Sequence, residues 1–393
     1  MKVLKETLSL CPVCLKEIPA TVYEREDGIY IKKECDEGHG KWDVMFEPCK
    51  DYYKRTMQTE FFHNDPPHFT MGIPITHECN LKCPFCYAPD RDTKYDLSRD
   101  KILEIIRTFR GKHVTLTGGE PTMNPHLPEF IKATRDAGLD NCLVSNGVKL
   151  ADKAYLQTLI DAGMVDILFP MYGFDDEIYK EMTGRALLQN RLTVLQNLID
   201  ADMPICLSFT FVRGRNEEQF PKVLEYALKN SDHVHQIRMR SVSPGGACGS
   251  ENPFFISEYL DVISKAFDVT PQEMIDFSLG EGPYYKYTFP ESYKAPRTPI
   301  HFELQIINFM RDRAANGNKR CQELLDLMPK KNNDDPNFRR RPEVFFINCW
   351  HWGSLETVDL MNFRNMIISL YSYNKGEMNF LEATLLSGRG VDL

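Results

Sequence analysis

Residues 77–90 read HECNLKCPFCYAPD and place Cys79, Cys83 and Cys86 in one short loop, with three residues in the first gap and two in the second. This spacing predicts an iron–sulfur cluster held at three corners, whose fourth iron is free to bind a small molecule and pass it an electron. The alternative is a zinc site, but zinc sites favour paired C-x2-C units that close a tetrahedron, and no fourth ligand lies nearby. The loop therefore indicates a catalytic cluster.

Two further motifs follow the cysteine loop, each after a helix-like segment. The apolar run 113–117 (HVTLT) leads into GGEP at 118–121, and residues 143–147 read LVSNG. With Phe85, the aromatic residue before the last cysteine, these motifs resemble the signature of the radical S-adenosylmethionine (SAM) superfamily. The resemblance implies a [4Fe–4S] cluster and SAM as cofactors.

The same resemblance implies which residues contact SAM. The Gly-Gly-Glu motif is expected to meet the methionine amino group, since glycines permit close backbone approach and a carboxylate pairs with an ammonium. In residue terms, the expected cofactor contacts are Cys79, Cys83, Phe85, Cys86, Gly118, Gly119, Glu120, Ser145, Asn146, Ser208 and Arg238. One departure is Tyr172, which stands where relatives often carry an acidic residue after the fourth strand. The nearby Asp175 is expected to cap a helix.

The middle of the chain alternates between apolar periods of two and 3.6 residues. Strands are predicted at 72–76, 113–117, 141–145, 165–171, 204–212 and 234–242. Helices are predicted at 98–110, 126–137, 152–162, 175–183, 188–201 and 216–229. Because strands separated by helices form a parallel sheet with right-handed crossovers, the fold class is α/β. The resemblance makes it a partial (β/α)6 barrel, whose site lies at the carboxyl ends of the strands.

Polar residues on the fifth and sixth predicted strands are expected to face the barrel interior. Ser208 alternates with apolar residues on the fifth strand, and Arg238 and Arg240 share one side of the sixth. Two guanidinium groups inside a barrel would be costly without anions, so they are better anion-binding candidates than Arg213 and Arg215, which follow the fifth strand.

The first 60 residues carry a second metal-binding pattern. Cys11 and Cys14 form one pair, and Cys35 lies after a hairpin-like stretch with two competing partners, His39 and Cys49. His39 has the better local spacing, whereas Cys49 would give an all-thiolate site that suits iron as well as zinc. Too few apolar residues lie in this segment to build a core without such a metal. The sequence predicts one zinc or rubredoxin-like iron.

We therefore expect three domains: a metal module at 1–60, the barrel at 68–245, and a mostly helical substrate-side extension at 246–393. Helices of the extension are predicted at 256–267, 302–315, 319–328 and 355–371.

Within the superfamily, the N-terminal CPVC and KECDEGHG motifs are similar to those of the tetraether synthase group. That resemblance implies hydrogen abstraction from an unactivated C–H bond of a small-molecule or lipid-like substrate. An excess of basic residues at 311–341 would suit an anionic substrate, although a solvated helix face is the favoured explanation. No cysteine follows Cys349, where relatives hold an auxiliary cluster, so one cluster per chain is expected.

Composition is typical of a cytoplasmic protein. The 393 residues have a net charge of −9, which argues against nucleic acid as a partner. No apolar run reaches the roughly 20 residues of a membrane span, and the first residues do not form a signal peptide. Twelve cysteines in such a protein are expected to be metal ligands or buried thiols.

The predicted mechanism is reductive cleavage of SAM, with an electron from an external donor of the flavodoxin or ferredoxin type. Cys248, in a glycine-rich loop, is the candidate for returning a hydrogen atom to the substrate. Two other classes of function remain open. An iron–sulfur redox relay or sensor would not need the GGEP motif in a barrel, and a zinc-stabilised binding protein would be colourless.

Overall fold

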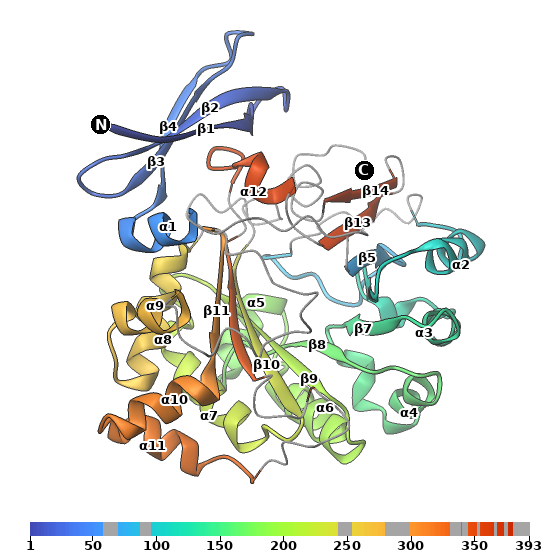
Figure 1. Cartoon of the computed structure of the whole chain (residues 1–393). Helices are drawn as coiled ribbons and strands as arrows, with labels where there is room; N and C mark the ends of the chain where they lie inside the picture. Colours follow the sequence, from blue (N-terminus) through green and yellow to red (C-terminus); the bar gives the residue numbers. More distant parts are fainter. Residues whose placement is uncertain are drawn as a thin grey trace.

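The computed structural model describes residues 1–57, 70–86, 96–242, 254–279, 299–330, 339, 345–351, 354–364, 368–372 and 376–379. In this part of the chain, a small N-terminal sheet stands beside a ten-stranded sheet that is surrounded by helices (Figure 1). The predicted domain boundaries near 60 and 245 lie outside the described residues.

The N-terminal sheet is an antiparallel meander of β1 (Lys2–Leu10), β2 (Glu17–Glu24), β3 (Ile29–Glu34) and β4 (Lys41–Glu47). Its strands alternate in burial, so that Val22, Ile31 and Phe46 lie in one apolar cluster. Tyr53 from α1 (Lys50–Met57) completes this cluster. The hairpin expected between the two cysteine motifs is therefore confirmed as β2 and β3.

The N-terminal sheet docks on the C-terminal segment that precedes α12 (Leu360–Arg364). Ser9 on β1 donates its hydroxyl to the carbonyl of Val358 at 2.6 Å, and the buried Nζ of Lys33 donates to the carbonyl of Leu355 at 2.5 Å. Figure 1 shows α12 beside this sheet. The first and last parts of the chain are thus joined through hydrogen bonds.

Six parallel strands form the centre of the larger sheet: β5 (Thr70–Pro74), β6 (His113–Thr117), β7 (Asp140–Val144), β8 (Ile167–Pro170), β9 (Ile205–Phe211) and β10 (Val234–Ser241). The helices between them are α2 (Arg99–Thr108), α3 (Leu127–Asp136), α4 (Lys153–Asp161), α5 (Asp176–Thr183), α6 (Leu188–Asp200) and α7 (Phe220–Lys229). All six predicted strands are confirmed to within a few residues, as are the helices. The strands neighbour one another in chain order, as a barrel wall requires.

Capping side chains fix where several of these helices begin. Ser98 accepts a hydrogen bond from the backbone of Lys101 at the start of α2, which confirms it as the predicted cap. Asp175 accepts from the backbone N–H of Glu177 at 2.9 Å and caps α5. Its role is therefore the predicted capping role.

The C-terminal extension is mostly helical, as expected, and its described residues also supply strands. Its elements are α8 (Ile256–Phe267), α9 (Pro271–Leu279), β11 (His301–Gln305), α10 (Ile306–Ala315), α11 (Lys319–Asp326), β12 (Phe346–Trp350), α12, β13 (Ile368–Ser372) and β14 (Gly376–Asn379). The predicted helix at 302–315 begins too early, and the one at 355–371 contains a short helix and most of a strand. The first error concerns β11, whose partner β12 lies far away along the chain, and the second concerns β13, which pairs with the distant β5 and the neighbouring β14.

The larger sheet has one face packed on the helices and a second face turned away from them. Alternate residues of β9 to β12 join the main apolar core with the helices: Leu207, Phe209, Ile237, Met239, Phe302, Leu304, Ile347 and Cys349. The residues between them therefore lie on the second face, which we call the inner face. Strands β12 and β11 extend this face beyond β10, because β12 pairs parallel with β10 and antiparallel with β11.

Candidate functional site

The cysteine loop follows β5 and lies at the carboxyl end of the parallel strands. Cys79, Cys83 and Cys86 are half-buried thiols, and Phe85 beside them is half-buried. The backbone N–H of Cys86 donates to the carbonyl of Cys83 at 3.2 Å, and the N–H of Leu81 points to the Sγ of Cys79 at 3.5 Å. Partly exposed thiols that receive N–H donors suit the thiolate ligands of an iron–sulfur cluster.

Two glycines at the end of β6 allow the barrel to touch the cysteine loop. A Cβ on Gly118, whose φ is +136°, would lie 2.2 Å from the carbonyl oxygen of Thr76, and one on Gly119 would lie 2.4 Å from that of Glu78. The backbone N–H of Gly119 donates to Thr76 at 2.7 Å, and that of Glu120 donates to Glu78 at 2.8 Å. The close approach expected for the glycines is therefore an approach to the loop that precedes Cys79.

Glu120 is fully buried, and its carboxylate is bound by protein donors. One oxygen, Oε1, accepts from the hydroxyl of Thr122 at 2.6 Å and from that of Ser145 at 2.7 Å, while Oε2 accepts from the backbone N–H of Asn146 at 2.6 Å. These bonds join the ends of β6 and β7. The pairing of this carboxylate with an ammonium, as implied by the family resemblance, stays a prediction.

Asn146 connects the end of β7 to the cysteine loop. Its Nδ2 donates to the Oδ1 of Asn80 at 2.7 Å and lies 3.8 Å from the Sγ of Cys79. Its Oδ1 accepts from the backbone N–H of Val148 at 3.0 Å, which fixes the side-chain rotation. Asn146, expected near SAM, thus lies beside the predicted cluster ligand Cys79, and Ser145 precedes it in the chain.

Arg191 on α6 is a site residue that the sequence analysis missed. Its side chain is fully buried over the rings of Phe169 and Tyr179, and one Nη donates to the carbonyl of Asn146. Its Nε and other Nη have no hydrogen-bond partner among the described residues. Burial lowers the pKa of Arg191, and the nearby Cys83 acts against this shift. A charge at an apolar-face position of a helix was the signal for this residue.

Tyr172 follows β8, and its pKa responds to groups of both the cysteine loop and β10. Burial raises the pKa of Tyr172 to about 12, and the thiol of Cys83 adds to the shift, while Arg191 and Arg240 oppose it. Charged groups of β10 and of the cysteine loop therefore act on the same phenol. The departure noted in the sequence falls inside the site.

Ser208 on β9 and Arg238 on β10 are paired in register and lie side by side on the inner face. Ser208 is 1% exposed, and both its Oγ and the Nε of Arg238 lack a hydrogen-bond partner among the described residues. One step along the strands, Arg240 points its Nε to the hydroxyl of Thr210 at 3.5 Å. The two arginines thus share one face, as predicted from their spacing.

The two loop arginines are held in surface ion pairs instead. Arg213 pairs with Glu258 at 2.6 Å, and Arg215 pairs with Glu181 at 3.1 Å. Both side chains are therefore engaged in ion pairs away from the inner face.

The remaining candidate cysteines occupy different environments. Cys248 lies outside the described residues. Cys321 and Cys349 are buried in the main apolar core, and burial raises the pKa of both thiols, to about 12 for Cys321. Cys142 and Cys206 form a small inner cluster with Leu168.

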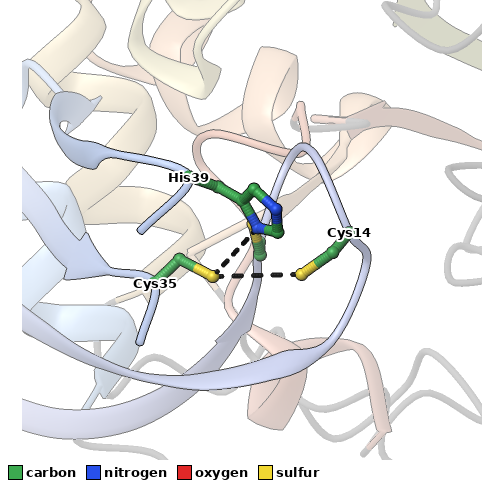
Figure 2. Close-up of side chains that lie close together, drawn as sticks. Cys14, Cys35 and His39 are labelled. Atoms are coloured by element: carbon green, nitrogen blue, oxygen red, sulfur yellow. Dashed lines mark hydrogen bonds between the residues drawn. The ribbon is translucent and has the colours of Figure 1, made fainter. Parts of the chain in front are cut away.

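The N-terminal sheet brings together a four-ligand metal site. Cys11, Cys14, Cys35 and His39 place their ligand atoms within 4.8 Å of one another. Figure 2 shows three of them, Cys14, Cys35 and His39, pointing toward one another. The Sγ of Cys35 lies 3.4 Å from Nδ1 of His39 and 3.9 Å from the Sγ of Cys14. Cys49, the competing fourth ligand, is not in this group and lies instead just before α1. Three thiols and one imidazole at this separation suit tetrahedral zinc.

Hydrogen bonds favour the thiolate form of Cys11, one of the four ligands of this site. Although burial acts to raise the pKa of Cys11, hydrogen bonds from the backbone of Cys14 and Val13 outweigh it and lower that pKa to about 6. A thiol that ionises readily is a better metal ligand.

Fold and site together define a class of protein: an α/β barrel with a three-cysteine loop at the carboxyl ends of its strands and a separate metal-binding module before it. The radical SAM superfamily model matches residues 73–227, and the HMPTM N-terminal zinc ribbon domain matches residues 3–47. The chain contains a radical SAM domain preceded by an N-terminal zinc ribbon.

Curated relatives are similar over part of their length. The 7,8-dihydro-6-hydroxymethylpterin dimethyltransferase of Methanocaldococcus jannaschii is 33% identical over 67% of this chain and 59% of its own length. A probable GTP 3',8-cyclase of Saccharolobus islandicus is 30% identical over 49% of this chain and 65% of its own. The chain thus spans less than two thirds of each relative.

The chain is also similar to a solved structure, that of Streptococcus suis SuiB bound to the precursor peptide SuiA. The match covers 56% of this chain and 48% of the SuiB chain, with 14% sequence identity and a TM-score of 0.46. No helix in the described part of the chain is long and apolar enough to cross a bilayer.

Proposed function

We propose that this chain holds a [4Fe–4S] cluster on Cys79, Cys83 and Cys86 and uses it to cleave SAM reductively. The observation that carries the proposal is the attachment of the cysteine loop to two neighbouring strand ends. The end of β6 is hydrogen-bonded to the backbone before Cys79, and Asn146 at the end of β7 is hydrogen-bonded to Asn80. Such attachment positions ligands and substrate before the reaction begins.

The reaction balances as a one-electron reduction followed by a hydrogen-atom transfer. When bound, the cluster would supply one electron to the sulfonium of SAM. The C5′–S bond breaks, two electrons leave as a lone pair on the sulfur of methionine, and one stays on the 5′-deoxyadenosyl radical. This radical takes a hydrogen atom from an unactivated C–H bond of the substrate. The electron is restored by an external donor of the flavodoxin or ferredoxin type.

The chain's own part is to orient SAM and to hold the loop. We assign SAM binding to the strand ends at Gly118, Gly119, Glu120, Ser145 and Asn146, and to Ser208 and Arg238 on the inner face. The N-terminal site binds zinc in a structural role, because all four positions of a tetrahedron are filled by protein ligands.

We propose a small heterocyclic substrate in preference to a lipid. The names of the two curated relatives refer to a pterin and to GTP, whose ring systems share an aminopyrimidinone ring. The buried polar residues of the inner face support a polar ring more readily than a hydrocarbon chain. The tetraether synthase resemblance remains the alternative for the substrate.

Anaerobic reconstitution tests the proposed chemistry. With a strong reductant and SAM, the protein is expected to form 5′-deoxyadenosine, whereas Cys83→Ala is expected to lose it together with about four iron atoms. Cys321→Ala is the control, because that thiol is buried in the main core. Undiminished 5′-deoxyadenosine formation by Cys83→Ala would sink the proposal.

A further inference from the structure

Four polar residues form one row across the inner face, from β9 to β11. The strand pairings set Ser208 opposite Arg238, Arg238 opposite Asn348, and Asn348 opposite Glu303. Their strand neighbours all belong to the apolar core on the helix side. We call these four residues the polar row. A row of polar side chains on the interior face of a barrel is costly unless their groups are paired.

The polar row is incompletely paired. Ser208 and Asn348 are 1% and 5% exposed, yet the Oγ of Ser208, the Nε of Arg238 and the Oδ1 of Asn348 have no hydrogen-bond partner among the described residues. Native proteins leave few buried polar atoms unpaired, so adjacent cases on three strands need an explanation. A bound ligand that pairs with them would provide one.

One end of the polar row is held rigidly in place. The Nδ2 of Asn348 donates to the Nε2 of His301 at 2.8 Å and to the Oε2 of Glu303 at 3.1 Å. The ring of His301 lies against that of Trp350, with centroids 4.2 Å apart. Because both donor positions of the amide are used, Oδ1 is fixed as an acceptor that is free for another molecule. The Oε1 of Glu303 makes no hydrogen bond within the described residues.

The polar row lies below the proposed reaction site on the same face. Arg240 and Thr210 are two residues further along their strands toward the carboxyl ends. Besides burial, Cys83 and Cys86 raise the pKa of Tyr172, whereas Arg240 lowers it. Arg240, two residues beyond Arg238 on β10, and the cysteine loop therefore act on the same side chain.

The order of groups along the row selects a ligand chemistry. From β10 to β11 it reads donor, acceptor, acceptor: the Nε of Arg238, the Oδ1 of Asn348 and the Oε1 of Glu303. A carbonyl, a ring N–H and an amino group on adjacent atoms of a 4-oxo-2-aminopyrimidine ring present the complementary order. A hydrocarbon chain would leave all three groups unpaired.

We propose that the polar row is the recognition site for the aminopyrimidinone edge of a planar heterocyclic substrate. This inference rests on the proposed function, since it places the substrate of that reaction on the inner face beyond SAM. Arg238 then belongs to substrate binding as well as to the environment of SAM. Glu303 and Asn348 are specificity-determining residues that pair with the ring N–H and amino donors.

Binding to the full-length, reconstituted protein tests the inference without any turnover. Isothermal titration calorimetry at pH 8 would compare a 2-amino-4-oxopteridine with the matching 2,4-dioxopteridine, in which an acceptor oxygen replaces the amino donor. The wild-type protein is expected to bind the dioxo compound at least about tenfold more weakly. Glu303→Gln and Ser208→Ala would be measured beside Glu323→Gln, a control on the exposed side of α11.

The expected result is a loss of affinity for the aminopteridine of about tenfold in Glu303→Gln, a smaller loss in Ser208→Ala, and no change in Glu323→Gln. Equal affinity of wild-type protein for both pteridines would overturn the inference, as would binding of a long-chain acyl probe in place of either. Formation of 5′-deoxyadenosine from SAM is measured separately. If it is absent in the wild-type protein, the proposed function fails while the binding data still decide the role of the polar row.

Discussion

Asn146 donates its side-chain Nδ2 to the Oδ1 of Asn80 at 2.7 Å, and the same nitrogen lies 3.8 Å from the Sγ of Cys79. The backbone of Asn146 is held on both sides, because its N–H donates to Glu120 and its carbonyl accepts from Arg191. A single residue at the end of β7 therefore links a neighbouring strand, a helix and the cysteine loop. A substitution of Asn146 should therefore affect the cysteine loop more than the barrel.

Asn146→Asp should lower the reduction potential of the cluster. The substitution replaces the donor beside Cys79 with a carboxylate, which disfavours the more negative, reduced cluster. A shift of roughly 50 mV corresponds to the loss of one such interaction. A redox titration followed by electron paramagnetic resonance would measure it, with Asn316→Asp at the end of α10 as the control. A potential equal to that of the wild type would contradict the linking role of Asn146.

Glu120→Ala should destabilise the protein even in the absence of SAM. The buried hydroxyl of Ser145 and the backbone N–H of Asn146 would lose their acceptor, at a cost of about 3 kcal/mol in the free energy of unfolding. Chemical denaturation would measure the loss. Glu129→Ala is the matched control, because Glu129 makes an exposed pair with Arg99. If stability falls only when SAM is present, the carboxylate serves the ligand and not the strand ends.

Sequence periodicity predicted the central barrel because each strand and helix there is a local pattern with neighbours in chain order. Spacing also found the candidate ribbon ligands but left His39 and Cys49 as open alternatives; it is the folded sheet that groups His39 with Cys35 and the other two cysteines. Spacing could not find β11, whose partner β12 lies far along the chain. The polar row was missed for the same reason: Glu303 and Asn348 meet only through that pairing.

Removal of the ribbon ligands should release one metal ion per chain. A Cys11→Ser/Cys14→Ser variant is expected to lose the ribbon metal and to keep the iron of the cluster, since the two sites share no ligand. Cys49→Ser should keep every metal, because Cys49 lies outside the four-ligand group. Metal analysis by mass spectrometry would measure both. Loss of one metal from Cys49→Ser would show that the ligand set is not Cys11, Cys14, Cys35 and His39.

The stability of the protein should fall between about pH 4.5 and pH 7 through Glu303. Burial raises the pKa of its carboxyl from 4.5 to about 7, so the folded state holds a proton that the unfolded state has lost. The contribution of Glu303 to the free energy of unfolding is fully present below pH 4.5 and is lost as the pH rises through 7. The facing groups are Arg238, Asn348 and His301, and burial lowers the pKa of His301 to about 4.

Glu303→Gln removes this pH dependence. The difference in free energy of unfolding between the variant and the wild type should therefore shift in favour of the variant by up to about 3 kcal/mol from pH 4.5 to above pH 7. Denaturation curves at pH 5 and pH 8 would measure it. The buried Glu47, whose pKa is also raised to about 7, contributes to both proteins and cancels in the comparison. A difference that does not change with pH would show that Glu303 is ionised throughout.

The docking of Ser9 on Val358 sets an order of events during synthesis. These two residues are 349 positions apart, so at about 5–20 residues per second the ribbon leaves the ribosome on the order of 20–70 s before its docking surface exists. All four of its metal ligands are made within the first 39 residues. The ribbon can therefore capture its ion while the barrel is still being translated, and its attachment to the C-terminal segment becomes a late step of assembly.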